Sequence, residues 1–210
     1  MNFTQFVAKQ FAFPRGFGGR IATFIMNCMN RKQYKAVFDN IAVTPEDVIL
    51  DIGFGNGFMI KKLLKKQPRL VCGVEIATDM LDRVKKDNAV FVADGWLDLQ
   101  LADVQQLPYP NNYFDNIYTV NTIYFWQNAP QCFSEIARTL KDNGAFYNVF
   151  YSKEWLDKLR YTRYGFSKNN MEDMLEMTTD CGLKIDRVIE ISKGKAYCIV
   201  GKKQTEFSER

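Results

Sequence analysis

Three glycines at alternate positions follow a short apolar segment and a single acid. They are Gly53, Gly55 and Gly57, preceded by Asp51. Glycines allow a tight turn and let a ligand approach the backbone closely, so the loop is typical of nucleotide binding. A dinucleotide site would carry its third glycine where Phe58 stands. The spacing therefore favours a nucleoside that carries no phosphate, with a purely structural turn as the alternative.

A second acid, Glu75, ends the next apolar segment and lies 22 positions after Gly53 (75 − 53). This is close to the spacing of about 20 residues between a glycine loop and an acid that binds ribose. A carboxylate here can accept hydrogen bonds from both ribose hydroxyls, and such charge-assisted bonds are the stronger kind. A solvated surface glutamate is the alternative, but two acids at successive strand ends favour the binding site.

Apolar segments that read as strands and as helices alternate around these residues, which predicts a doubly wound, Rossmann-like α/β fold. Its sheet is expected to be mainly parallel with an antiparallel C-terminal hairpin, and ligands bind such folds at the carboxyl ends of the strands. The expected strands are residues 48–52, 70–75, 96–102, 114–119, 145–150, 184–191 and 196–202. The expected helices are 20–40, 59–66, 78–95, 130–140, 154–161 and 171–181, with a turn at 141–144. Residues 90–92 also suit a strand, but the better alternation of LDLQLAD after Trp96 favours a helix that ends at Gly95.

Residues 48–150 resemble a class I S-adenosylmethionine-dependent methyltransferase of the small-molecule type, related to the methyltransferase domain 11 and 25 groups. Several ordered motifs carry the resemblance. They are Asp51 to Gly57, Glu75, Ala102-Asp103-Val104 followed by Leu107-Pro108 and Phe114-Asp115, the segment 120–126, and the turn 138–144. The resemblance implies a seven-stranded fold, S-adenosylmethionine as cofactor and S-adenosylhomocysteine as product.

The resemblance also assigns roles to single residues. Asp51 and the glycines would hold the methionine end, Glu75 the ribose, and Asp103 the adenine amino group, with Val104 offering its backbone. Asp94 also follows an apolar triplet and is the alternative adenine acid, but the Leu-Pro and Phe-Asp pairs that come later favour Asp103. The residues expected to bind the cofactor are Asp51, Gly53, Gly55, Gly57, Glu75, Ile76, Met80, Asp103, Val104 and Asn121.

A methyl transfer asks little of the protein, because the sulfonium cofactor already carries the activation. Aromatic faces near the positive sulfur stabilise it electrostatically. The chain has no histidine, which removes the commonest general base and metal ligand, and no metal is expected. Tyr124 is the candidate catalytic residue. Phe17, Tyr124, Trp126, Tyr151 and Tyr161 are the candidate substrate-binding residues, with core packing as the alternative for the aromatic side chains.

We expect one domain over residues 1–210, in which 41–150 forms the cofactor-binding core. Residues 1–40 are expected to form a helical lid, and 151–210 a helical insertion followed by the strand pair. Both flanking segments are rich in aromatic residues, which suits a lid that excludes water. A subunit interface, as in a homodimer, or a contact with a membrane surface is the alternative.

Composition limits the function further. The 28 basic and 24 acidic residues give a net charge of +4, which by itself requires neither nucleic acid nor a membrane. Five scattered cysteines without a CxxC pair, and no apolar run near the ~18 residues of a membrane span, predict a cytoplasmic protein without a transmembrane segment. Asn121-Thr122-Ile123-Tyr124 replaces the Asp/Asn-Pro-Pro-Tyr/Phe segment of enzymes that methylate base amines or glutamine amides, and nucleic-acid substrates are not expected.

These observations favour a methyltransferase acting on a small-molecule acceptor through an amine, thiol, hydroxyl or ring carbon. Two alternatives remain from other classes. One is an NAD(P)-dependent oxidoreductase, and the other is a non-catalytic subunit that binds S-adenosylmethionine or a protein partner.

Overall fold

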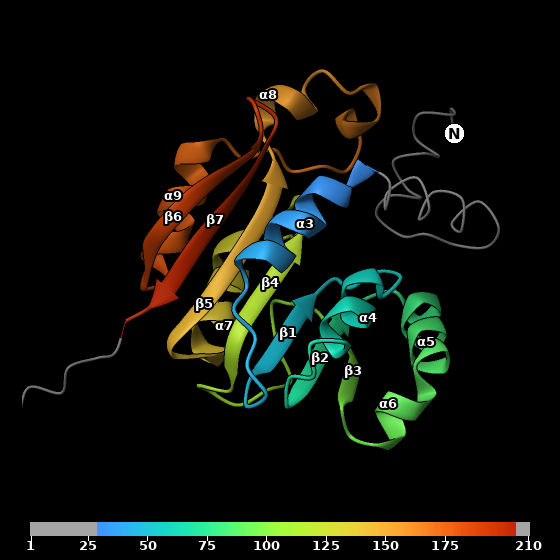
Figure 1. Cartoon of the computed structure of the whole chain (residues 1–210). Coiled ribbons are helices and arrows are strands. Elements are labelled where there is room, and N and C mark those ends of the chain that lie inside the picture. The colour runs from blue at the N-terminus through green and yellow to red at the C-terminus, as the bar shows by residue number, and fades with distance from the viewer. Residues whose placement is uncertain (1–28, 205–210) are drawn as a thin grey trace, which may run out of the picture.

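The structure is a computed structural model and describes residues 29–204. Its centre is a seven-stranded sheet in the order β3-β2-β1-β4-β5-β7-β6 (Figure 1). β1 to β5 run parallel, and only β7 pairs antiparallel with its neighbours β5 and β6. The strands are β1 (Val48–Ile52), β2 (Leu70–Glu75), β3 (Leu97–Leu101), β4 (Phe114–Val120), β5 (Leu140–Tyr151), β6 (Leu183–Ser192) and β7 (Ala196–Lys203). The predicted doubly wound fold with an antiparallel C-terminal pair is confirmed.

Helices cover both faces of the sheet, which forms the middle of three layers (Figure 1). On one face α3, α4 and α5 bury an apolar cluster against β1, and on the other face α7 and α9 bury a second cluster. All five residues of β1 are buried, as expected for a central parallel strand covered on both faces. The helices are α3 (Arg31–Asn40), α4 (Phe58–Leu64), α5 (Thr78–Asp87), α6 (Ala89–Ala93), α7 (Ala129–Thr139), α8 (Lys153–Leu156) and α9 (Met171–Asp180), with 3₁₀ turns η1 (Ile123–Phe125) and η2 (Arg160–Arg163).

The segment 90–92 is helical, as favoured, but the expected helix 78–95 is divided. α5 ends at Asp87, the φ of −128° at the next residue, Asn88, breaks the helical path, and α6 follows directly. The buried side-chain amide of Asn88 donates to the Val84 carbonyl at 2.8 Å and so satisfies an acceptor in the last turn of α5.

Two other expectations are corrected. The expected turn 141–144 lies inside β5 as a bulge, because the pairing jumps from Phe114 opposite Leu140 to Asn116 opposite Ala145. Asn143, one of the extra residues of this bulge, has a φ of +62°. The expected helix 154–161 is only the short α8, capped by the Ser152 hydroxyl, and then η2.

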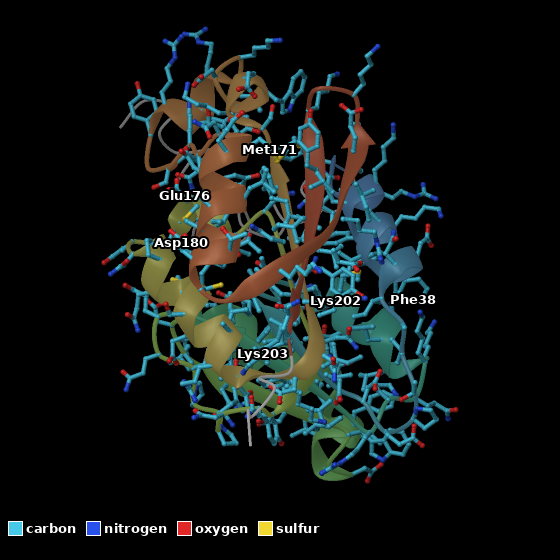
Figure 2. All side chains as sticks on the ribbon, turned by 90° about the vertical axis from the view of Figure 1, so that its left-hand side faces the viewer. Phe38, Met171, Glu176, Asp180, Lys202 and Lys203 are labelled. Carbon is cyan, nitrogen blue, oxygen red and sulfur yellow. The ribbon has the colours of Figure 1, made fainter. Side chains whose placement is uncertain are left out.

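The C-terminal strand pair and α9 form one side of the molecule. Figure 2 shows α9 beside the C-terminal strands, with Lys202 and Lys203 near the end of β7. Glu176 and Asp180 are exposed on the outer surface of α9, whereas Met174 is fully buried. A capping box with Asn170 fixes the start of this helix. The pair therefore closes the far end of the sheet and leaves the ends of β1 to β4 to form the site.

Candidate active site

The acids and the amide predicted from the motifs come together at one edge of the sheet. Asp51 lies in β1, Glu75 ends β2, Asp103 follows β3 by two residues, and Asn121 directly follows β4. These four strands are neighbours and parallel, so their carboxyl ends meet at the same edge.

The glycine loop after β1 has a conformation that side chains do not tolerate. Gly53 has a φ of +69°, and a Cβ at this position would lie 2.5 Å from Cγ2 of Thr122. Gly55 has a φ of +53° and nothing within 4 Å of the place of a Cβ. The first glycine is therefore required by packing, whereas the second presents bare backbone to the space above the sheet.

The carboxylate of Glu75 is oriented by three backbone amides. Oε1 accepts from Ile76 at 2.9 Å and from Ala77 at 3.0 Å, and Oε2 accepts from Gly55 at 3.0 Å. Burial raises the pKa of this carboxyl, and the three amides act in the opposite direction. Because a carboxylate oxygen accepts about two hydrogen bonds, Oε2 keeps capacity for one hydroxyl donor, whereas Oε1 is filled.

Asp51 is a buried carboxyl without a cationic partner. Only 4% of the residue is exposed, and no ion pair within residues 29–204 includes it. Burial raises its pKa from 3.8 to about 7; the nearby Tyr118 hydroxyl lowers it and the Glu75 charge raises it. Among residues 29–204 the Tyr118 hydroxyl has no hydrogen-bond partner of normal geometry. Both polar groups are therefore arranged to receive a positively charged, hydrogen-bonding ligand.

Asp51 opens into a small pocket with about 260 Å³ of empty space, which we call the polar pocket. Residues from α3, β1, the glycine loop and β4 line it: Tyr34, Asp51, Gly53, Phe54, Phe58, Met59, Tyr118 and Val120.

The two possible adenine acids lie at opposite ends of β3. Asp94 precedes the strand and caps the end of α6, away from the glycine loop. Asp103 follows the strand at the site edge, is exposed, and accepts from the backbone and side chain of Gln105 at 2.9 and 3.2 Å. The position of Asp103 thus agrees with the interpretation favoured from the motifs, although its contact with adenine stays a prediction.

Three further residues expected at the cofactor differ in exposure. Ile76 is 46% exposed directly after Glu75, whereas Met80 on α5 and Val104 are buried. An exposed isoleucine beside a cluster of polar groups suits a flat apolar ligand surface.

A second pocket, the aromatic pocket, lies above the ends of β4 and β5. It contains about 400 Å³ of empty space, its open mouth included. Tyr124, Tyr151 and Tyr161, all predicted to bind substrate, line it together. The described lining is completed by Met29, Asn30, Asn121, Phe125, Leu156 and Phe166. No motif in the sequence singles out Asn30 or Leu156, which tertiary structure alone brings here.

Hydrogen bonds fix the floor of the aromatic pocket. The Tyr124 hydroxyl donates to Oδ1 of Asn121 at 3.0 Å and accepts from the backbone amide of Tyr151. Nδ2 of Asn121 donates to Oδ1 of Asn30 at 2.9 Å, and a φ of +59° turns Asn121 out of β4. Burial raises the pKa of Tyr124 well above its usual value, with the Tyr151 amide acting in the opposite direction. Its catalytic role stays a prediction.

Phe166 is the centre of the aromatic wall. Its ring centroid lies 5.7 Å from that of Tyr124, nearly stacked at 28°, and 4.8 Å from that of Phe125 at 65°. Tyr161 adds an edge contact at 6.0 Å and 69°. Such packing holds the rings in fixed orientations.

One residue predicted to bind substrate, Trp126, does not line this pocket in the described structure. Trp126 is 8% exposed and packs edge-on against Phe133 in the core, with ring centroids 5.9 Å apart. Phe17 lies outside the described residues.

Within residues 29–204, no group of three or more metal-ligating side chains suits a metal ion. No helix in this part of the chain is long and apolar enough to cross a membrane.

A family model described as a methyltransferase domain matches residues 50–148. The chain is 33% identical over 119 residues to the biotin biosynthesis bifunctional protein BioHC of Teredinibacter turnerae, covering 53% of this chain and 21% of that protein. It is 31% identical over 124 residues to the demethylmenaquinone methyltransferase of Symbiobacterium thermophilum, covering 58% and 48%. The chain thus spans less than half the length of either relative.

A similar solved structure is that of a methyltransferase in complex with the Haloferax volcanii Trm112 methyltransferase activator. The TM-score is 0.78 at 17% identity, over 96% of this chain and 98% of that one. The motifs, the seven-stranded sheet and the match over residues 50–148 agree: this part of the chain is a methyltransferase domain with the class I fold, and its cofactor is S-adenosylmethionine.

Proposed function

We propose that the chain transfers the methyl group of S-adenosylmethionine to a small, largely apolar molecule held in the aromatic pocket. The observation that carries this proposal is a wall shared by two pockets of different chemistry. Val120 lines the polar pocket, and the next residue, Asn121, lines the aromatic pocket. On the side of α3, Tyr34 lines the first and Asn30 the second, and the Tyr34 amide donates to the Asn30 carbonyl at 2.9 Å.

The polar pocket receives the methionine end of the cofactor. Asp51 pairs with the ammonium group, which explains a buried carboxyl that has no ion pair within the described residues. Gly53 and Gly55 leave room for the ligand to pass close to the backbone. The Tyr118 hydroxyl, which has no partner of normal geometry among the described residues, lies beside Asp51 and is a further polar group for the same ligand.

The nucleoside follows the strand ends toward β3. Oε2 of Glu75 accepts a ribose hydroxyl, and binding of both hydroxyls requires one backbone amide to release the carboxylate. Asp103 accepts from the adenine amino group beside the backbone of Val104. Ile76 and Met80 contribute apolar surface for the adenine ring.

When bound, the cofactor supplies a methyl group activated by a positive sulfur. The residues of the chain then orient the acceptor and exclude water, which are the main requirements of an in-line displacement. Tyr124 holds Asn121 and the last residue of β5 in place through its two hydrogen bonds. The rings around Phe166 surround the acceptor with apolar surface. The matched demethylmenaquinone methyltransferase is named for a small-molecule acceptor, which supports this class.

Two measurements test the proposal. Calorimetry with S-adenosylmethionine and with NAD distinguishes the cofactor: binding of NAD alone would refute the proposal and favour an oxidoreductase. Release of S-adenosylhomocysteine is then followed over a panel of ring-bearing amines, thiols, phenols and quinols. Cofactor binding without turnover across the panel favours the second candidate, a methyltransferase that needs a protein partner, as the Haloferax complex with an activator suggests.

A further inference from the structure

The chemistry of the aromatic pocket limits how an acceptor can react there. None of its nine described lining residues carries a carboxylate, an ammonium or a guanidinium group, and the whole sequence lacks histidine. Residues 1–28 contain no Asp, Glu or Tyr. Among the described lining residues, the side chains able to accept a proton from an acceptor are therefore the three tyrosines.

The tyrosines are poor bases in this environment. The Tyr124 hydroxyl already donates its proton to Asn121 and accepts from the Tyr151 amide. The Tyr151 hydroxyl donates to the Met29 carbonyl at 3.4 Å. Burial raises the pKa values of Tyr124, Tyr151 and Tyr161, so all three phenols stay protonated near neutral pH.

The other titratable groups around the pocket do not face it. Asp51 lies in the polar pocket with Tyr34, whose pKa is raised to about 12 by burial. Glu75 is held by three amides. On α8, η2 and the residues between them the charged side chains are all exposed: Lys153, Glu154, Asp157, Lys158, Arg160 and Arg163.

We infer that the acceptor enters the aromatic pocket already ionised, as an apolar thiolate or acidic phenolate, and that none of the described side chains of the pocket removes its proton. This inference rests on the proposed methyl transfer. In the step, a lone pair of the sulfur or oxygen anion forms the new bond to the methyl carbon. The bond from that carbon to the sulfonium breaks, its electron pair stays on the sulfur, and no proton moves.

Electrostatics favours such an acceptor in an apolar pocket. The anion and the sulfonium attract one another strongly where the dielectric constant is low, so the cofactor itself provides the missing positive charge. Both products are neutral at the reacting atoms, and the charge decreases toward the transition state. Exclusion of water therefore lowers the barrier for an anion more than for a neutral amine.

The test compares thiophenol, 4-nitrophenol, phenol and aniline, which share one ring. The value of kcat/KM for each acceptor is measured from pH 6 to 10 at saturating S-adenosylmethionine, so that titration of Asp51 does not enter. The apparent pKa of the profile should follow the pKa of each acceptor. Phenol, with a pKa near the ~10 of tyrosine, is ionised to about one part in a thousand at pH 7, so its kcat/KM should be roughly 100-fold or more below that of thiophenol.

Variants separate the inference from its rivals. Tyr161→Phe and Tyr151→Phe each remove a phenol, and the apparent pKa for 4-nitrophenol should stay the same in both. Tyr124→Phe is measured with its melting temperature, because it also removes the acceptor of the Tyr151 amide. If all acceptors share one apparent pKa, or if a tyrosine variant loses that apparent pKa, the inference is overturned and a side chain of the protein is the base.

The remaining outcomes are also decisive. Methylation of aniline alone overturns the inference but leaves the proposed function standing. Cofactor binding without methylation of any of the four compounds overturns the inference too. Absence of cofactor binding refutes the proposed function itself.

Discussion

Replacement of Asp51 by asparagine should stabilise the cofactor-free protein at neutral pH and weaken cofactor binding. The reason is that the folded state holds this carboxyl in a buried pocket without a cation in the described structure, and burial raises its pKa from 3.8 to about 7. Asparagine has nearly the same shape but no charge. The variant therefore removes the cost of ionisation and keeps the packing of β1.

The sign and size of this change in stability follow from the linkage between protonation and folding. Because the folded pKa is raised, the contribution of Asp51 to stability is fully present below the unfolded value near 3.8 and is lost as the pH rises through about 7. Full ionisation costs the folded state about 4 kcal/mol, since one pKa unit corresponds to about 1.4 kcal/mol. Between pH 5 and pH 8 the free energy of unfolding of Asp51→Asn should rise by about 3 kcal/mol relative to the unmodified protein. That corresponds to a relative increase in melting temperature of about 5–10 °C.

The assay is urea unfolding followed by tryptophan fluorescence, at several pH values from 5 to 8 and without cofactor. Asp82→Asn is the matched control, because Asp82 is an exposed carboxyl on α5. Its difference from the unmodified protein should change little with pH. Parallel stability profiles for Asp51→Asn and the unmodified protein would refute the argument that Asp51 titrates in this range.

The same variant tests the proposed ammonium site. At a cofactor concentration 100 times the dissociation constant, a ligand stabilises the folded protein by about 2.7 kcal/mol. The unmodified protein should gain this amount with S-adenosylmethionine, and Asp51→Asn should gain much less. Equal gains would show that Asp51 does not bind the ammonium group.

Three other perturbations have defined outcomes. Glu75→Ala should weaken S-adenosylmethionine binding by about 1.5–3 kcal/mol, the range for hydrogen bonds to charged groups, and an unchanged calorimetric dissociation constant would exclude a ribose contact. Gly53→Ala should lower the melting temperature and abolish cofactor binding, because the new Cβ would lie 2.5 Å from Cγ2 of Thr122 and the backbone has a positive φ. A second substitution, Thr122→Ser, removes that methyl group and should restore part of the lost stability. Arg138→Ala should lower the free energy of unfolding in urea by about 2–3 kcal/mol, since the guanidinium donates to two backbone carbonyls of the loop between β3 and β4. The exposed control Arg163→Ala should lower it by less than about 0.5 kcal/mol.

The positions of the three acids at the strand ends were predictable because each acid lies in a short local motif. Asp51, Glu75 and Asp103 each sit at the end of one apolar strand, and parallel pairing brings such ends to one edge. Their positions at this edge agree with the prediction, while their contacts with the cofactor stay predictions.

The aromatic pocket was less predictable because its residues meet only in the tertiary structure. Asn30 and Asn121 are 91 positions apart when they form their hydrogen bond. Phe166 occupies the centre of the aromatic wall, yet its sequence neighbours are polar or glycine and give no periodic signal. Trp126, by contrast, follows two pocket residues and still turns into the core.

The bulge in β5 shows a different limit. Lys141-Asp142-Asn143-Gly144 is a sound turn signal, and Asn143 does adopt a positive φ. The pairing with β4 nevertheless continues on both sides of these residues. Local propensity therefore predicted the backbone conformation of Asn143 correctly, whereas the bounds of β5 depend on its pairing with β4.

Part of the aromatic pocket comes from a stretch of sequence that contributes no residue to the polar pocket. The polar groups proposed to bind cofactor come from β1 to β4 and the residues that follow them, whereas Tyr151, Leu156, Tyr161 and Phe166 all come from the last residue of β5 and the connection to α9. Mutations in that connection can therefore exchange one acceptor for another and leave the affinity for S-adenosylmethionine intact. In this architecture a new substrate preference can evolve without loss of the shared cofactor.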